Sequence, residues 1–156
     1  MSRVLLCNDD GIDAPGLGLL ERCARRVFDE VIVVAPASEQ SGVGMGLTLH
    51  DPMRFRAHGE DRWSVTGTPV DCMIAAFCHL LGDRSVDLVL SGINRGPNLG
   101  HDVYYSGTAA GAREGLMRGV PAIALSLAGR GRYPFDAYEG LVTHLLRWAA
   151  TRPASA

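Results

Sequence analysis

Short apolar runs alternate with helix-like segments along most of the chain, and this order limits the fold more than any other feature. Residues 3–7 and 30–35 have the pattern of buried strands on either side of an amphipathic helix at residues 16–28, which makes one βαβ unit. Further strands are expected at residues 86–90 and 122–126, and further helices at residues 68–81, 108–118 and 135–150. Because parallel strands need such crossovers, the order predicts an α/β fold with a mostly parallel sheet and helices on both faces.

The segment after the second strand has a different pattern. A glycine-rich loop at residues 36–46 is followed by alternating polar and apolar stretches at residues 47–50, 53–57 and 63–66. We expect these stretches to form a small antiparallel ribbon.

Length and composition indicate one domain at residues 1–150 and a polar tail at residues 151–156 that is expected to fray. The 156 residues, 47% of them hydrophobic, suffice to bury a sizeable core. A net charge of -2 without a basic block argues against a nucleic-acid polymer as partner. No apolar run has the length of a membrane span and the N-terminus has no signal-like pattern, so a cytoplasmic location is expected.

Two residue types exclude common cofactor chemistry. The four cysteines lie in apolar segments without C-x-x-C spacing, which argues against zinc and against disulfides. The chain has no lysine, which excludes a P-loop lysine and a Schiff-base lysine. A bound phosphate must therefore meet backbone amides, hydroxyls, arginine or a metal ion.

Two adjacent carboxylates, Asp9 and Asp10, follow the first strand directly, and Gly11 lets the chain turn there. At about 4 to 5 Å apart, two unpaired carboxylates repel by roughly 3 to 4 kcal/mol at an effective dielectric near 20. A shared divalent metal ion is the simplest compensation, and a solvated turn is the alternative.

Loops that follow parallel strands meet at one edge of the sheet, where ligands of such folds bind. Besides the first loop, this edge is expected to receive Ser41 after the second strand and Asn94 after the strand at residues 86–90. Carboxylate, hydroxyl and amide oxygens together suit Mg²⁺ or Mn²⁺ better than zinc. From residue type alone, however, a loop serine or asparagine more often forms a local turn.

A second group of polar residues lies where a long loop meets the helix at residues 108–118. Asn98, Ser106, Gly107 and Thr108 place hydroxyls and free backbone N–H groups where an anion can bind. Ser106 and Thr108 would serve equally well as helix caps. A metal site beside an anion site indicates phosphate chemistry.

Three further polar residues are left outside the predicted site. Asp71 stands three residues after Thr68, the spacing of a capping box, so we expect it to cap the helix. Arg95 is expected to be solvated, and His101 receives no role.

Four segments, in chain order, resemble the SurE family of survival-protein nucleotidases: NDDGIDAPG, VVAPASEQSG, GTPVDC and SGINRGPNLGHDVYYSGT. The resemblance implies a Rossmann-like, metal-dependent phosphatase that hydrolyses nucleoside 5′- and 3′-monophosphates, with some members also trimming short polyphosphate. It places catalytic roles on Asp9 and Asp10. The implied metal ligands are Asp9, Asp10, Ser41 and Asn94, and the implied phosphate contacts are Asn98, Ser106, Gly107 and Thr108.

The expected reaction is attack by a water molecule that one Mg²⁺ or Mn²⁺ ion activates on a nucleoside monophosphate. Covalent transfer of the phosphoryl group to Asp9 is the rival mechanism. Family members usually continue beyond this length with further strands and an arm exchanged between subunits, so the resemblance implies a homodimer or homotetramer if other contacts replace these C-terminal ones. A non-catalytic nucleotide or phosphate binder, or an inactive truncated form, is the alternative function.

Overall fold

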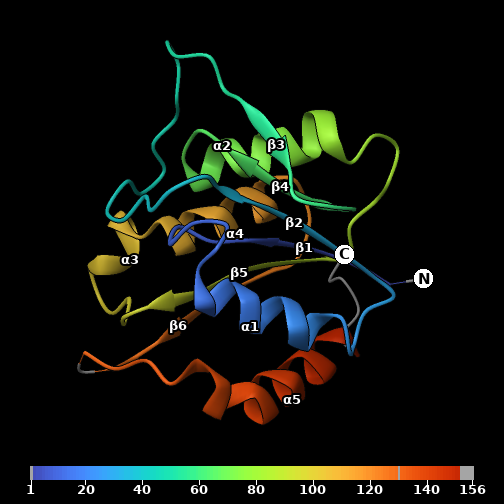
Figure 1. The fold of residues 1–156 in the computed structure, drawn as a ribbon, viewed down its shortest axis with the longest axis vertical. Helices are drawn as coiled ribbons and strands as arrows, with labels where there is room; N and C mark the ends of the chain where they lie inside the picture. The colour runs from blue at the N-terminus through green and yellow to red at the C-terminus, as the bar shows by residue number, and fades with distance from the viewer. Residues whose placement is uncertain (1, 130, 152–156) are drawn as a thin grey trace.

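The computed structural model describes residues 2–129 and 131–151, which form helical layers on both faces of one six-stranded sheet (Figure 1). The strands are β1 (Arg3–Cys7), β2 (Glu30–Pro36), β3 (Phe55–Ala57), β4 (Arg62–Val65), β5 (Leu88–Arg95) and β6 (Ala122–Leu127). The α-helices are α1 (Pro15–Ala24), α2 (Pro69–Ala75), α3 (Asp102–Tyr105), α4 (Gly107–Met117) and α5 (Glu139–Ala150). A π-helical turn (Ala76–Leu80) extends α2, and a 3-10 turn (Phe135–Tyr138) precedes α5.

The strand order is β3-β4-β2-β1-β5-β6, and every neighbouring pair is parallel except β3 and β4. The chain moves outward from β1 to β2 and β4, and then returns to the other side of β1 to form β5. Such a reversal leaves a crevice beyond the carboxyl ends of the central strands, where ligands of open α/β sheets bind.

Strand β1 is buried on both faces. Val4 and Leu6 belong to the core under α1 and α5, whereas Leu5 and Cys7 belong to the core under α2, and all four side chains have 0% exposure. Alternate side chains of a strand point to opposite faces, which explains this division. The residues that follow β1 therefore start from a rigid, central position.

Helix α4 packs unusually close to β5, on the same face as α2 (Figure 1). A Cβ added to Gly111 would lie 2.8 Å from Ser91 Oγ, and one added to Gly115 would lie 2.7 Å from Val89 Cγ2. Only glycine fits at these contacts, and the close approach sets where the N-terminus of α4 lies.

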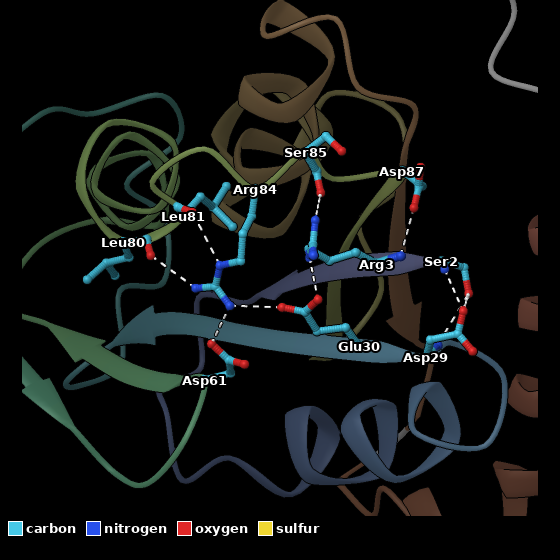
Figure 2. Close-up of polar contacts among 10 residues, drawn as sticks. All are labelled: Ser2, Arg3, Asp29, Glu30, Asp61, Leu80, Leu81, Arg84, Ser85 and Asp87. Carbon is cyan, nitrogen blue, oxygen red and sulfur yellow. Dashed lines mark hydrogen bonds and ion pairs between the residues drawn. The ribbon is translucent and has the colours of Figure 1, made fainter.

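The rim at the amino ends of the strands is held by an ion-pair network (Figure 2). Arg3 Nε lies 2.6 Å from Glu30 Oε2, and Arg84 Nη1 lies 2.8 Å from both Glu30 Oε1 and Asp61 Oδ1. Arg84 also donates to the Leu81 carbonyl, at the end of the π-helical turn. The network secures the rim opposite the predicted site.

The predicted fold class is confirmed, including the mostly parallel sheet, helices on both faces and a small antiparallel pair. The helix predicted at residues 16–28 ends earlier, at Ala24, because residues 25–27 form a turn that brings the chain back to β2. The stretch at residues 47–50 is no strand, since the Thr48 amide donates to the Asp71 carboxylate and not to a neighbouring strand.

The region after residue 90 also differs from the prediction. Strand β5 continues to Arg95, because a register shift between Ser91 and Asn94 lets it keep pairing with β6. Asn94 therefore lies on a strand and not in a loop. The short helix α3 was not predicted either.

Two further sequence predictions concern the polar tail and membrane-spanning segments. Residues 152–156 of the predicted tail lie outside the described residues, so the division into residues 1–150 and 151–156 stays a prediction. Among the helices that the structure describes, none combines the length and apolarity needed to cross a membrane.

The close packing of α4 predicts the effect of filling its glycine contact. Gly115→Ala should lower the free energy of unfolding by about 1 to 3 kcal/mol, because the added methyl group meets Val89. Urea unfolding measures the change. In the matched control Gly140→Ala nothing lies within 4 Å of the added Cβ, so stability should stay the same or rise by up to about 1 kcal/mol. Equal effects in the two helices would contradict the packing argument.

Candidate functional site

Asp9 lies just beyond β1 in the acidic turn, which we define as residues 8–11, and only 4% of it is exposed. Its Oδ1 atom accepts a 2.6 Å hydrogen bond from the Thr108 hydroxyl. A Cβ added to Gly107 would lie 2.7 Å from Asp9 Cβ, so the carboxylate and the first turn of α4 are in direct contact. A negative charge is favourable at this end of a helix.

The surroundings of Asp9 disfavour its charge on balance. Burial raises the pKa of Asp9, the Thr108 hydrogen bond lowers it, and the charge of Asp10 raises it again. Since the result is a raised pKa, the hydrogen bond does not compensate the loss of water around the ionised carboxylate. A bound cation would supply that compensation.

Asp10 turns toward a different element from Asp9. Its Oδ2 atom accepts a 3.0 Å hydrogen bond from the Arg95 backbone N–H at the end of β5. Burial raises the pKa of Asp10, the Arg95 hydrogen bond and charge lower it, and nearby Glu39 raises it. Glu39 itself faces Arg95, with 3.5 Å between Oε1 and Nη2. The acidic turn thus links α4 and β5.

The conformation of the acidic turn is held from within. Gly11 has a φ angle of 101°, which side-chain-bearing residues rarely adopt, so it permits the sharp turn after the two aspartates. The buried Asn8 side chain donates a 2.9 Å hydrogen bond to the Gly11 carbonyl across this turn.

Two backbone hydrogen bonds bring the predicted ligands Ser41 and Asn94 toward the acidic turn. The Gln40 N–H, next to Ser41, donates to the Asp9 carbonyl at 2.7 Å. The Arg95 N–H, next to Asn94, donates to the Asp10 carboxylate. The loop after β2 and the end of β5 therefore meet the acidic turn at one edge of the sheet, and ligation by Ser41 and Asn94 stays a prediction.

The donor atoms at this edge fit a hard divalent cation. Within the described residues no three His, Cys, Asp or Glu side chains group as a metal site, so an ion would need neutral oxygen ligands besides the two carboxylates. Asn94 donates through its amide nitrogen to the Gly96 carbonyl, which leaves the amide oxygen to ligate. The Ser41 hydroxyl donates to Glu39 at 2.9 Å, and its lone pairs can ligate. An all-oxygen shell of this kind suits Mg²⁺ or Mn²⁺.

The predicted phosphate contacts divide into two groups. Ser106, Gly107 and Thr108 form the start of α4, where Ser106 Oγ accepts a 3.0 Å bond from the Ala109 N–H and so caps the helix. The helix-cap role that the sequence offered for both hydroxyl residues is therefore confirmed for Ser106. The Thr108 hydroxyl is directed to the acidic turn instead. Asn98 lies farther along the loop and donates to Ser126 Oγ at 2.8 Å. Their contact with phosphate stays a prediction.

Asp71 does more than the helix capping predicted for it. It forms the capping box with Thr68, and its Oδ2 atom also accepts a 2.6 Å bond from the Thr48 hydroxyl. It thereby ties the loop after β2, which carries Ser41, to α2. No sequence pattern indicates this pairing, because the two residues are 23 positions apart. The Glu39–Arg95 pair was missed for the same reason.

Fold and site together define a Rossmann-like α/β protein with an acidic, oxygen-rich site at the reversal of its strand order. The family model "Survival protein SurE" matches residues 4–154, and the chain belongs to this family.

Named relatives and a solved structure agree with this assignment. The chain is 54% identical to the 5′-nucleotidase SurE of Rhodospirillum rubrum, over 97% of this chain and 60% of that protein. It is 49% identical to the 5′-nucleotidase SurE of Beijerinckia indica, over 92% of this chain and 59% of that protein. The crystal structure of the SurE protein from Aquifex aeolicus superposes with a TM-score of 0.90 at 39% identity, covering 97% of this chain and 61% of that one. The chain thus spans about three-fifths of the length of these relatives.

The buried charge of Asp9 is expected to lower the thermal stability of the metal-free protein and to permit metal binding. In the presence of a chelator, Asp9→Asn should raise the thermal midpoint by roughly 2 to 4 °C, because Asn removes the buried charge and keeps an oxygen for the Thr108 hydroxyl. Added Mn²⁺ should raise the midpoint of the unmodified protein but not of this variant. Scanning calorimetry measures both shifts.

Asp83→Asn provides the control, since Asp83 is exposed and lies in another loop. It should change neither midpoint. A lower midpoint of Asp9→Asn in chelator would show that the surroundings of Asp9 favour its charge, against the argument above.

Proposed function

We propose that this chain is a metal-dependent phosphomonoesterase that hydrolyses nucleoside 5′- and 3′-monophosphates, with short polyphosphate as a secondary substrate. Family membership and relatives named 5′-nucleotidase support the proposal. The observation that carries it is the contact of Asp9 with Gly107 and Thr108. Through this contact the acidic turn and the N-terminus of α4 lie directly against each other.

Asp9, Asp10, Ser41 and Asn94 would hold one divalent ion, Mg²⁺ or Mn²⁺. When bound, the ion supplies positive charge to a phosphoryl oxygen and lowers the pKa of a water molecule. The choice of Ser41 and Asn94 follows the family resemblance, and the oxygen-only donor set at the edge of the sheet agrees with it.

The start of α4 would bind the phosphoryl group itself. Backbone N–H groups in the first turn of a helix have no partner within the helix, and the helix dipole adds partial positive charge there. The Gly107 N–H, with the side chains of Ser106 and Asn98, would hold phosphoryl oxygens as charge accumulates in the transition state. The Thr108 hydroxyl keeps Asp9 in place for the same step.

Water is the proposed nucleophile. A carboxylate that ligates a cation and accepts a hydrogen bond from Thr108 is a weak nucleophile, which disfavours a covalent intermediate on Asp9. A cytoplasmic location and a homodimer or homotetramer remain predictions that go with this function.

The proposal predicts metal-dependent turnover of AMP. Phosphate release should require Mn²⁺ or Mg²⁺, stop in excess chelator, and fall by roughly 10²- to 10³-fold in Asp9→Asn and in Asp10→Asn. Asp83→Asn should retain the activity of the unmodified protein. Release of inorganic phosphate measures each rate. Tight AMP binding without turnover in any divalent metal would instead support the non-catalytic binder.

The water mechanism predicts that no phosphoryl group resides on the protein. After rapid acid quenching during turnover of ³²P-labelled AMP, labelled protein should stay below about 5% of active sites. A stable, hydroxylamine-sensitive label at Asp9, lost in Asp9→Asn, would favour the covalent rival.

A further inference from the structure

The charged pair of Glu39 and Arg95 lies at the edge of the site and has no role in the mechanism described so far. Glu39 is on the loop after β2 that also carries Ser41, and Arg95 is the last residue of β5, directly after Asn94. Glu39 Oε1 lies 3.5 Å from Arg95 Nη2. The pair therefore connects the two segments that carry the neutral ligands predicted for the metal ion.

The same Glu39 oxygen also accepts a hydrogen bond from the Ser41 hydroxyl, at 2.9 Å. A serine hydroxyl has one hydrogen, which can rotate, and two lone pairs, whereas an ionised carboxylate only accepts. The bond therefore directs the Ser41 hydrogen toward Glu39 and leaves the lone pairs for another partner. A hydroxyl can ligate a cation only when its hydrogen points elsewhere.

The other three predicted ligands are also held by hydrogen bonds. Asp9 accepts from a threonine hydroxyl, Asp10 accepts from a backbone N–H, and Asn94 donates to a backbone carbonyl. Ser41 differs from them because its partner is a carboxylate that faces an oppositely charged side chain. Its orientation can therefore be changed by substitution of Glu39 alone.

The backbone beside Glu39 is fixed independently of the Glu39 side chain. The Gln40 N–H donates to the Asp9 carbonyl at 2.7 Å. The Glu39 and Arg95 side chains are 54% and 57% exposed, and ion pairs with such exposure contribute little to stability. We therefore expect Glu39 to affect the orientation of Ser41 and not the folding of the chain.

We propose that Glu39 is a positioning residue of the metal site, which orients the Ser41 hydroxyl as a ligand while Arg95 holds the Glu39 carboxylate in place. The inference rests on the proposed function, because it requires a divalent ion on the predicted ligands. Loss of a partner that orients a metal ligand typically lowers metal affinity about ten- to a hundredfold.

The test measures the affinity for Mn²⁺ without substrate, from the electron paramagnetic resonance signal of free Mn²⁺. Glu39→Ala should weaken Mn²⁺ binding at least about tenfold. Glu39→Gln keeps an oxygen that accepts from Ser41, so it should weaken binding by about threefold at most. Glu60→Ala, at an exposed glutamate between β3 and β4, is the matched control and should leave the dissociation constant unchanged. Equal losses in Glu39→Ala and Glu39→Gln would show that the charge matters and not the hydrogen bond, and would overturn the proposal.

A double-mutant cycle separates an effect through Ser41 from a direct effect of Glu39 on the ion. Ser41→Ala alone should weaken Mn²⁺ binding, and Glu39→Ala added to it should change the dissociation constant by less than about twofold. A tenfold effect of Glu39→Ala that persists without the Ser41 hydroxyl would overturn the proposal.

Thermal midpoints in chelator show whether the variants fold. Both Glu39 variants should unfold within about 2 °C of the unmodified protein, since the ion pair is exposed. A much larger drop in both variants would show that Glu39 stabilises the fold, against the proposal.

Failure of the proposed function would give a different result. In that case the unmodified protein would bind Mn²⁺ but release no phosphate from AMP, and the Mn²⁺ affinities of the variants would still decide about Glu39. If the unmodified protein leaves the Mn²⁺ signal unchanged, the metal site and the role of Glu39 are both refuted.

Discussion

The contact between the Asp9 carboxylate and the first turn of α4 is the constraint on which the arrangement of the site depends. It joins the end of β1, a strand buried on both faces, to the start of a helix that lies 99 residues later in the chain. For the contact to form, α4 must lie very close to β5, and this requires glycine at positions 111 and 115. The sheet, the helix and the carboxylate therefore specify one another's positions.

The two rims of the sheet differ in how their carboxylates are paired. At the amino ends, the carboxylates of Glu30 and Asp61 are paired with Arg3 and Arg84. At the carboxyl ends, Asp9 accepts from a neutral hydroxyl, and burial raises its pKa. The first rim satisfies its charges internally, whereas the second keeps negative charge that a ligand can neutralise. Residues that disfavour the unliganded state in this way are typical of binding sites.

Features with a local or periodic origin were predicted from the sequence. The alternation of apolar residues located β1 and β2, and the Thr68–Asp71 spacing located the start of α2. The acidic turn was found because two carboxylates before a glycine are unusual at a strand end. Features that depend on distant partners were not predicted. The bond of Thr48 to Asp71 prevents a strand at residues 47–50, and the pairing of β5 with β6 past a register shift places Asn94 on a strand.

Thr108 shows why a residue's role does not follow from its type and position alone. A hydroxyl at the start of a helix is equally suited to capping, to anion binding or to holding a neighbouring side chain, and only the position of Asp9 selects the last role. With Thr108 directed to the carboxylate and Ser106 Oγ accepting at the cap, the proposed phosphate site would depend mainly on the backbone N–H of Gly107. Backbone N–H groups recognise phosphate without reading what the phosphate is attached to. If the proposed function holds, discrimination among phosphate esters would therefore come from the neighbouring surface that meets the rest of the molecule.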